Sequence, residues 1–179
     1  MHVAGFSKRK AQTRTVHDFS IESDEQLQNP VLKRFDAVWR AGADAGRLPS
    51  RSEIDPGVIA DLLPHLMLVD VVRDDEDFVQ FRSRIVGEHL VGIDGRVRAG
   101  ETVYGNPDET DEMIEVVATG RPHYARCRAE NVADGVVDFE RVTYPLSSNG
   151  VDVDAVASIL VPRNAAPSRS RLHTFFSWL

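Results

Sequence analysis

Four residues of the sequence have side chains that could transfer protons inside a small cavity. They are His89, His123, Glu140 and Tyr144. Imidazole, carboxylate and phenol groups act as general acids and bases when two of them converge on a substrate. Their positions in the chain indicate no convergent pair. An isomerase or hydrolase with an acid–base residue in a cavity is therefore the weaker of two hypotheses.

The sequence contains no motif that indicates cysteine or metal chemistry. Cys127 is the only cysteine, so no disulfide or thiolate cluster can form within one chain. The sequence contains no His-x-x-x-His, Cys-x-x-Cys or calcium-loop pattern. No glycine-rich phosphate loop follows a strand at the required spacing. We therefore predict no metal site and no catalytic residue.

The distribution of charge argues against a nucleic-acid partner. The chain has 179 residues and a formal net charge of −7. Residues 1–17 and 163–179 are basic, so the body between them is strongly acidic and would repel phosphate groups. No apolar run reaches the roughly 18 residues that a membrane span needs, and the N-terminus lacks the apolar stretch of a secretory signal. We expect a soluble, cytoplasmic protein.

The N-terminal part is predicted to be a tail followed by a helical cap. Residues 1–28 are polar and assigned to the tail, although weak alternation near their end could add a short edge strand. Asn29 is a favourable N-cap, and an apolar stripe at helical spacing follows over residues 30–45. A shorter helix is expected over residues 56–63. The whole cap covers residues 29–65.

The rest of the chain predicts a small antiparallel sheet. Five runs have strand character: 66–72, 78–86, 123–131, 136–146 and 153–161. Between the second and third runs, residues 87–119 are helical and are broken repeatedly by glycine. The predicted fold class is therefore α+β: a five-stranded antiparallel sheet with a helical insertion after its second strand. This core spans residues 66–162.

Several segments resemble a known family of proteins. Two strands, a helical insertion, a connecting helix and three more strands follow one another in the order of the PAS fold. Segments 48–56, 62–66, 81–87 and 140–147 resemble a family of small, single-domain bacterial PAS proteins, and the likeness covers about residues 30–162. Two elements of that family carry the resemblance most specifically: Leu63, Pro64 and His65 in the first, and Glu140, Arg141 and Pro145 in the second.

The resemblance implies a sensory or regulatory module and not an enzyme. PAS domains bind small molecules, other proteins or both, and commonly form homodimers. The residues then expected to line a ligand pocket are His89, Tyr104, His123 and Tyr144. We expect no output domain in this chain, so that an unidentified regulatory protein would receive the signal by association.

The sequence leaves the cofactor unknown but argues against two candidates. A flavin-reactive PAS domain needs an Asn-Cys-Arg motif on a helix, whereas Cys127 lies in a predicted strand. Haem needs an axial ligand facing the pocket. His89 is the candidate in the insertion, and we interpret it instead as a partly exposed helix residue.

Three residues of the family-like elements have structural interpretations. We expect His65 to hydrogen-bond carbonyl groups at a helix end, with a ligand contact as the alternative. Glu140 and Arg141 are neighbours in a strand, so their side chains point to opposite faces. One of the two charges is expected to meet a cross-strand partner such as Arg126, Arg128 or Arg84.

Two groups of aromatic residues are candidates for a dimer contact. They are Phe35 and Trp39 in the N-terminal helix, and Phe175, Phe176 and Trp178 in the C-terminal tail of residues 163–179. Large aromatic side chains are typical interface anchors. The alternative for the helix is that it packs only on its own sheet. The sequence does not decide which group forms the contact.

Overall fold

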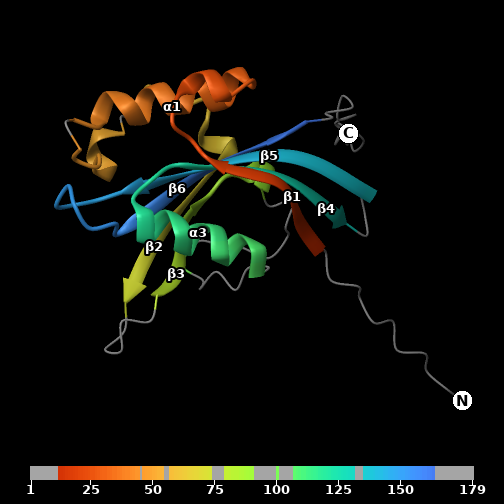
Figure 1. Cartoon of the computed structure of the whole chain (residues 1–179). Helices are drawn as coiled ribbons and strands as arrows, with labels where there is room; N and C mark the ends of the chain where they lie inside the picture. The colour runs from red at the N-terminus through yellow and green to blue at the C-terminus, as the bar shows by residue number, and fades with distance from the viewer. Residues whose placement is uncertain are drawn as a thin grey trace, which may run out of the picture.

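A six-stranded antiparallel sheet forms the centre of the protein (Figure 1). The computed structural model describes residues 12–44, 46–54, 57–73, 79–90, 100, 107–131 and 135–163. The strands are β1 (Gln12–Ser20), β2 (Leu66–Arg73), β3 (Val79–Val86), β4 (His123–Asn131), β5 (Gly135–Leu146) and β6 (Ala155–Pro162). Their order across the sheet is β1-β4-β5-β6-β2-β3. The predicted α+β class and the position of the insertion after the first hairpin are confirmed.

Strand β1 is a sixth strand, where the sequence predicted five. It pairs antiparallel with β4, and the register joins Ser20 to His123. The predicted tail of residues 1–28 therefore contains part of the sheet. A bulge between Thr15 and His17 interrupts the pairing. This irregularity breaks the period-two pattern by which a strand is recognised in a sequence.

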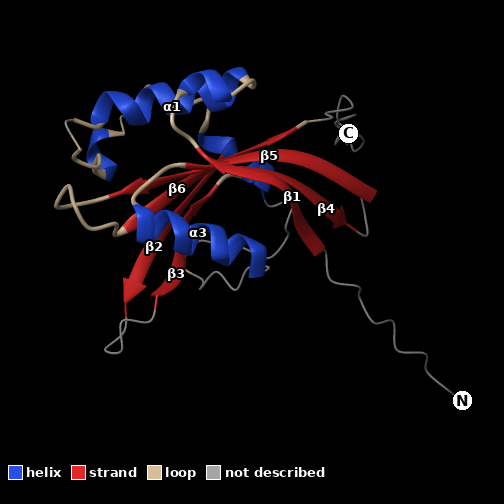
Figure 2. Ribbon diagram, viewed as in Figure 1, coloured by secondary structure: helices blue, strands red, loops and turns tan. Residues whose placement is uncertain are grey.

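Helix α1 (Pro30–Gly42) covers one face of the sheet, and helix α3 (Pro107–Thr119) covers the other (Figure 2). The side chain of Asn29 accepts a hydrogen bond of 2.9 Å from the Val31 N–H, which is the predicted N-cap. At the end of α3, Gly120 has a φ of +63°, a conformation that glycine adopts without strain.

The buried side of α1 is aromatic. Phe35 is completely buried and Trp39 is 7% exposed. Both rings have their centroids 5.3 Å from that of Tyr144 in β5, and the Trp39 indole N–H donates to the Pro145 carbonyl at 2.8 Å. These contacts lie within one chain. Phe35 and Trp39 are therefore not exposed anchors for a dimer, contrary to the prediction, because the helix uses them to bind its own sheet.

Short helical turns link the cap to the sheet. They are η1 (Asp24–Gln26), η2 (Arg51–Glu53) and η3 (Leu63–His65). The helix expected over residues 56–63 is replaced by turns over residues 57–62 and then η3. The backbone at Gly87 passes so close to η3 that a Cβ there would overlap the Leu63 and Pro64 carbonyl oxygens. A glycine is therefore required where the chain leaves β3.

Candidate functional site

A cluster of charged and polar side chains is buried between α3 and the sheet. Its members are Glu112 of α3, His123 of β4, Arg141 and Thr143 of β5, and Ser158 of β6. None of the five is more than 6% exposed. Buried polar groups lower stability unless they have partners, so the contacts among these side chains determine what the cluster can do.

Glu112 is the centre of this buried cluster. Arg141 donates to both oxygens of its carboxylate, with 3.3 Å between Nε and Oε1. The Thr143 hydroxyl donates to the same Oε1 at 3.0 Å, and His123 Nδ1 lies 3.4 Å from it. The Thr143 hydroxyl is also 3.1 Å from that of Ser158. One carboxylate thus joins α3 to the central strands of the sheet.

The charges in the cluster shift its titration. Burial favours the neutral form of Glu112, but Arg141 and His123 outweigh it and lower the pKa of Glu112 to about 2. Burial also opposes the charged form of His123. Nearby carboxylates outweigh that effect too and raise the pKa of His123, since Glu112 faces Nδ1, and Glu115 and Asp18 lie 3.9 and 3.6 Å from Nε2. The cluster therefore contains an anionic glutamate and a histidine that favours its cationic form.

Tyr144 and Glu140 lie on the opposite face of the sheet, where Tyr144 packs against α1. The Tyr144 hydroxyl donates to Asp36 at 2.8 Å, and burial together with Asp36 raises the pKa of Tyr144. Glu140 accepts a hydrogen bond of 2.9 Å from Tyr124. The sheet therefore separates both residues from His123. The prediction that Glu140 and Arg141 point to opposite faces agrees with these contacts.

The four acid–base candidates do not converge. His123 belongs to the buried cluster, Glu140 and Tyr144 lie behind the sheet, and His89 lies beside His65 near η3. The structure therefore brings only His123 of these four into the cluster. Of the other predicted site residues, Tyr104, Phe175, Phe176 and Trp178 lie outside the described residues.

The family-like elements hold segments of the fold together. Leu63, Pro64 and His65 form η3, and His65 Nδ1 lies 3.0 Å from the Leu160 carbonyl of β6. The expected carbonyl partner is therefore in the sheet and not at a helix end. Arg141 is paired with Glu112 of a helix, because α3 covers its face of the sheet. Glu140 has the partners on other strands: it accepts from Tyr124 of β4 and lies 3.7 Å from Arg163, just after β6.

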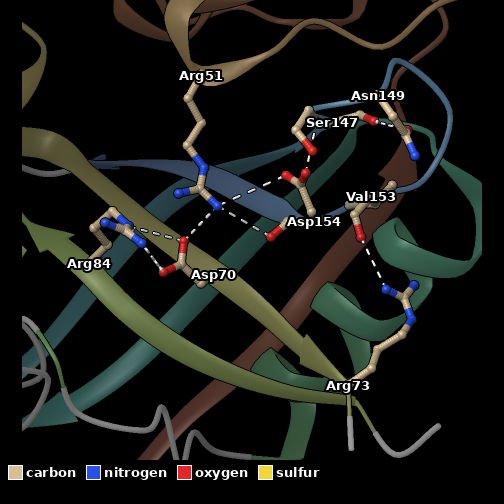
Figure 3. A network of polar contacts seen from close by, with 9 residues as sticks. Arg51, Asp70, Arg73, Arg84, Ser147, Asn149, Val153 and Asp154 are labelled. Carbon is tan, nitrogen blue, oxygen red and sulfur yellow. Dashed lines mark hydrogen bonds and ion pairs between the residues drawn. The ribbon is translucent and has the colours of Figure 1, made fainter.

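A second polar network fixes the segment before η3 on the sheet (Figure 3). Arg51 reaches Asp70 of β2 at 2.7 Å and the Asp154 carbonyl at 3.4 Å. Arg84 of β3 donates to both oxygens of Asp70 at 2.7–3.1 Å. Burial opposes ionisation of Asp70, but the two arginines lower its pKa. These side chains are far more exposed than the buried cluster, so the network positions a segment without forming an enclosed site.

An open depression lies away from both networks, at the end of α1. It has a volume of about 600 Å³ and is lined by Val38, Ala41, Gly42, Ala43, Asp44, Arg47, Glu53 and Val58. Arg47 pairs with Glu53 at 2.6 Å, and this hydrogen bond lowers the pKa of Glu53 to about 2. Of the predicted pocket residues that the structure describes, His89, His123 and Tyr144, none lines this depression.

Sequence reasoning missed Glu112, which is the centre of the buried cluster. A signal was present: Glu112 is four residues before Val116 and adjacent to Met113, so helical spacing places it on the buried stripe. Ser158 had no such signal, because every other residue of β6 from Ala155 to Val161 is also buried.

The strand order and the helical insertion define a PAS-like α+β domain. A family model described as a PAS domain matches residues 27–160, and the chain belongs to that family. A solved structure described as "Structure of an RNA-binding Light-Oxygen-Voltage Receptor" resembles the chain with 14% identity and a TM-score of 0.40. The alignment covers 86% of this chain and only 38% of that receptor chain. No curated protein matches the sequence.

None of the described helices is both long enough and apolar enough to span a membrane.

Proposed function

We propose that the protein is a cytoplasmic PAS-type regulatory module that acts by protein–protein interaction under the control of a small-molecule ligand. The observation that carries this proposal is the buried ion pair between Glu112 and Arg141. Apolar replacements of buried ion pairs are often neutral or stabilising, so such a pair is weak evidence for a purely stabilising role. A pair that joins a helix to the sheet is well suited to a switch.

The chemistry of Arg141 suggests which class of ligand would act. Guanidinium groups bind carboxylates and phosphates through two parallel hydrogen bonds. A small anionic ligand would therefore compete with Glu112 for Arg141 and weaken the link between α3 and β5. The partner protein would bind α3 differently once this link to the sheet is weakened. Apolar contacts of Met113 and Val116 would keep the helix near the sheet.

The dispersal of the acid–base candidates supports a role without catalysis. A general acid–base reaction needs two groups within reach of one substrate, whereas His89, His123 and Tyr144 lie in three different places. The net charge of −7 favours a protein partner over a nucleic acid. We also propose a homodimer, with Phe175, Phe176 and Trp178 as its contact in place of the buried side of α1.

Native mass spectrometry of freshly purified full-length protein tests the ligand, because it reports retained small molecules and the number of subunits. We expect a small anionic adduct in the wild type that is lost from Arg141→Lys, since lysine keeps the charge but loses the two-pronged geometry. Arg128→Lys is the matched control, because Arg128 pairs with Asp138 on the surface. Equal adducts in both variants, or none in the wild type, would contradict the proposed ligand.

Deletion of residues 170–179 tests the dimer contact. Light scattering on the wild type should give the mass of a dimer, and the shortened protein should give that of a monomer with unchanged circular dichroism. An unchanged mass would show that the aromatic tail is not the contact.

A further inference from the structure

Two histidines that are distant in the sequence meet at the surface near η3. His65 Nε2 lies 3.4 Å from His89 Nδ1, and the ring centroids are 4.6 Å apart with the planes at 72°. His65 is partly buried and His89 is exposed, so solvent reaches the pair. Two imidazole nitrogens at this distance either share a hydrogen bond or bind one cation between them.

The other ring nitrogen of His65 favours cation binding. Nδ1 lies 3.0 Å from the Leu160 carbonyl, which can only accept, so Nδ1 carries the hydrogen. In the neutral ring, Nε2 then has a free lone pair on the side of His89. A ring N–H held by a backbone carbonyl is the usual support of a metal-binding histidine.

The backbone holds the two rings in place before any ligand arrives. The Gly87 N–H donates to the Leu66 carbonyl at 2.8 Å, and the Leu90 N–H donates to the Gly87 carbonyl at 3.0 Å. Leu90 is buried, at 6% exposed. The residues on both sides of His89 are therefore anchored, while η3 fixes His65. A preorganised pair loses little conformational entropy on binding.

We propose that His65 and His89 form a surface site for a divalent transition-metal ion, with Cu²⁺ bound more tightly than Zn²⁺. Zinc–nitrogen bonds of 2.0–2.1 Å at a tetrahedral angle place two ligand nitrogens about 3.3 Å apart, which is close to the separation in this pair. Imidazole suits both ions, and the general order of affinities favours copper. Among the described residues no group of three or more His, Cys, Asp or Glu side chains converges, so water would complete the coordination.

Binding would tie the start of β2 to the beginning of the insertion. The metal would join η3, which precedes β2, to the helical turn at residues 88–90. We therefore expect slower hydrogen exchange at the Gly87 and Leu90 amides when metal is bound. This site is separate from the Glu112 cluster, so its failure and the failure of the anionic-ligand proposal can be told apart.

Titration of the metal-free full-length protein with CuCl₂ and ZnCl₂ tests the site by calorimetry. We expect one strong site per chain that weakens at least about tenfold in His89→Ala. His17→Ala is the matched control, because His17 is also exposed and its ring lies beside that of Phe19. Electron paramagnetic resonance of the copper complex should show coupling to two imidazole nitrogens in the wild type and to one fewer in His89→Ala.

Each of the following outcomes would overturn the proposal. The first is the absence of saturable binding to the wild type. The second is equal affinity in the wild type and His89→Ala. The third is loss of binding in His17→Ala. His89→Ala should fold normally because the side chain is exposed, and circular dichroism checks this. If His89→Ala lowers the melting temperature without metal and metal shifts both proteins equally, the pair is only a hydrogen bond.

Discussion

The two faces of the sheet bury polar groups in different ways. Under α1, the buried Asp36 carboxylate accepts from Tyr144 and pairs with Arg40, whose side chain reaches solvent, and the surrounding contacts are aromatic and apolar. Under α3, Glu112 is bound by Arg141 and Thr143 and faces His123. The first face is a mainly apolar core whose buried carboxylate, Asp36, pairs with an arginine at the surface. The second concentrates opposite charges where water is excluded.

The two faces are therefore expected to contribute differently: the α1 face to the free energy of unfolding, and the α3 face to the response to pH and to ligands. Aromatic burial contributes directly to folding and depends little on solution conditions. A buried ion pair contributes little net stability, but it responds strongly when one partner is removed, protonated or replaced. We therefore expect mutations under α1 to act as simple losses of packing, and mutations under α3 to depend on the partner and on pH.

The largest effect is expected from Phe35→Ala on the α1 face. Phe35 is completely buried, and removal of a buried phenylalanine ring lowers the free energy of unfolding by about 4 kcal/mol. Urea denaturation measures the change. Lys33→Ala on the exposed side of the same helix is the control. Similar losses in both variants would show that the helix does not stabilise the sheet through this ring.

Arg141→Ala should lower stability by about 3 kcal/mol, because it leaves the Glu112 carboxylate buried without its main partner. The double variant Glu112→Leu/Arg141→Met should recover most of this loss. Denaturation of the two variants and the wild type forms the comparison. A double variant as unstable as Arg141→Ala would mean that the ion pair is a net stabilising contact, which would remove the contrast between the two faces.

Asn29→Ala should have a smaller effect, of about 1 kcal/mol. It removes the side-chain oxygen that accepts from the Val31 N–H at the start of α1. Asn29→Asp is the matched control, since aspartate caps a helix equally well. If alanine and aspartate gave the same unfolding midpoint, the cap would contribute nothing to the α1 face.

The smallest effect is a pH dependence confined to the α3 face. The folded protein raises the pKa of His123 above its ordinary value of 6.5. Its stabilising contribution is therefore complete below 6.5 and is lost as the pH rises through the higher folded-state pKa. Unfolding midpoints should fall over this range in the wild type and change less in His123→Gln. Parallel curves for the two proteins would contradict the assigned charge of His123.

The sequence predicted the elements of the core well, because their patterns are local. The β2–β3 hairpin, the N-cap at Asn29 and the glycine at the end of α3 each depend on a few neighbouring residues. The surface against which α1 packs could not be predicted from neighbouring residues. The apolar stripe containing Phe35 and Trp39 fits a dimer interface and an internal face equally, and only the packing against Tyr144 decides between them.

Side-chain partners were the least predictable feature. No local pattern indicated the partner of Arg141, because Glu112 is 29 residues earlier, on a helix. His65 and His89 are 24 residues apart, so no local metal motif could reveal the pair. The backbone at Gly87 passes close to η3 and so brings these histidines together. In the sequence, the only sign of this close approach is the glycine itself.

The pairing of β1 with β4 has a practical consequence for where the domain can be cut. The family match begins at residue 27, but a fragment starting there would lack β1. The outer side of β4 would then present unpaired N–H and C=O groups from His123 to Glu130. Such a strand readily adds a strand from another molecule and promotes aggregation. A well-behaved fragment should therefore keep residues 12–20.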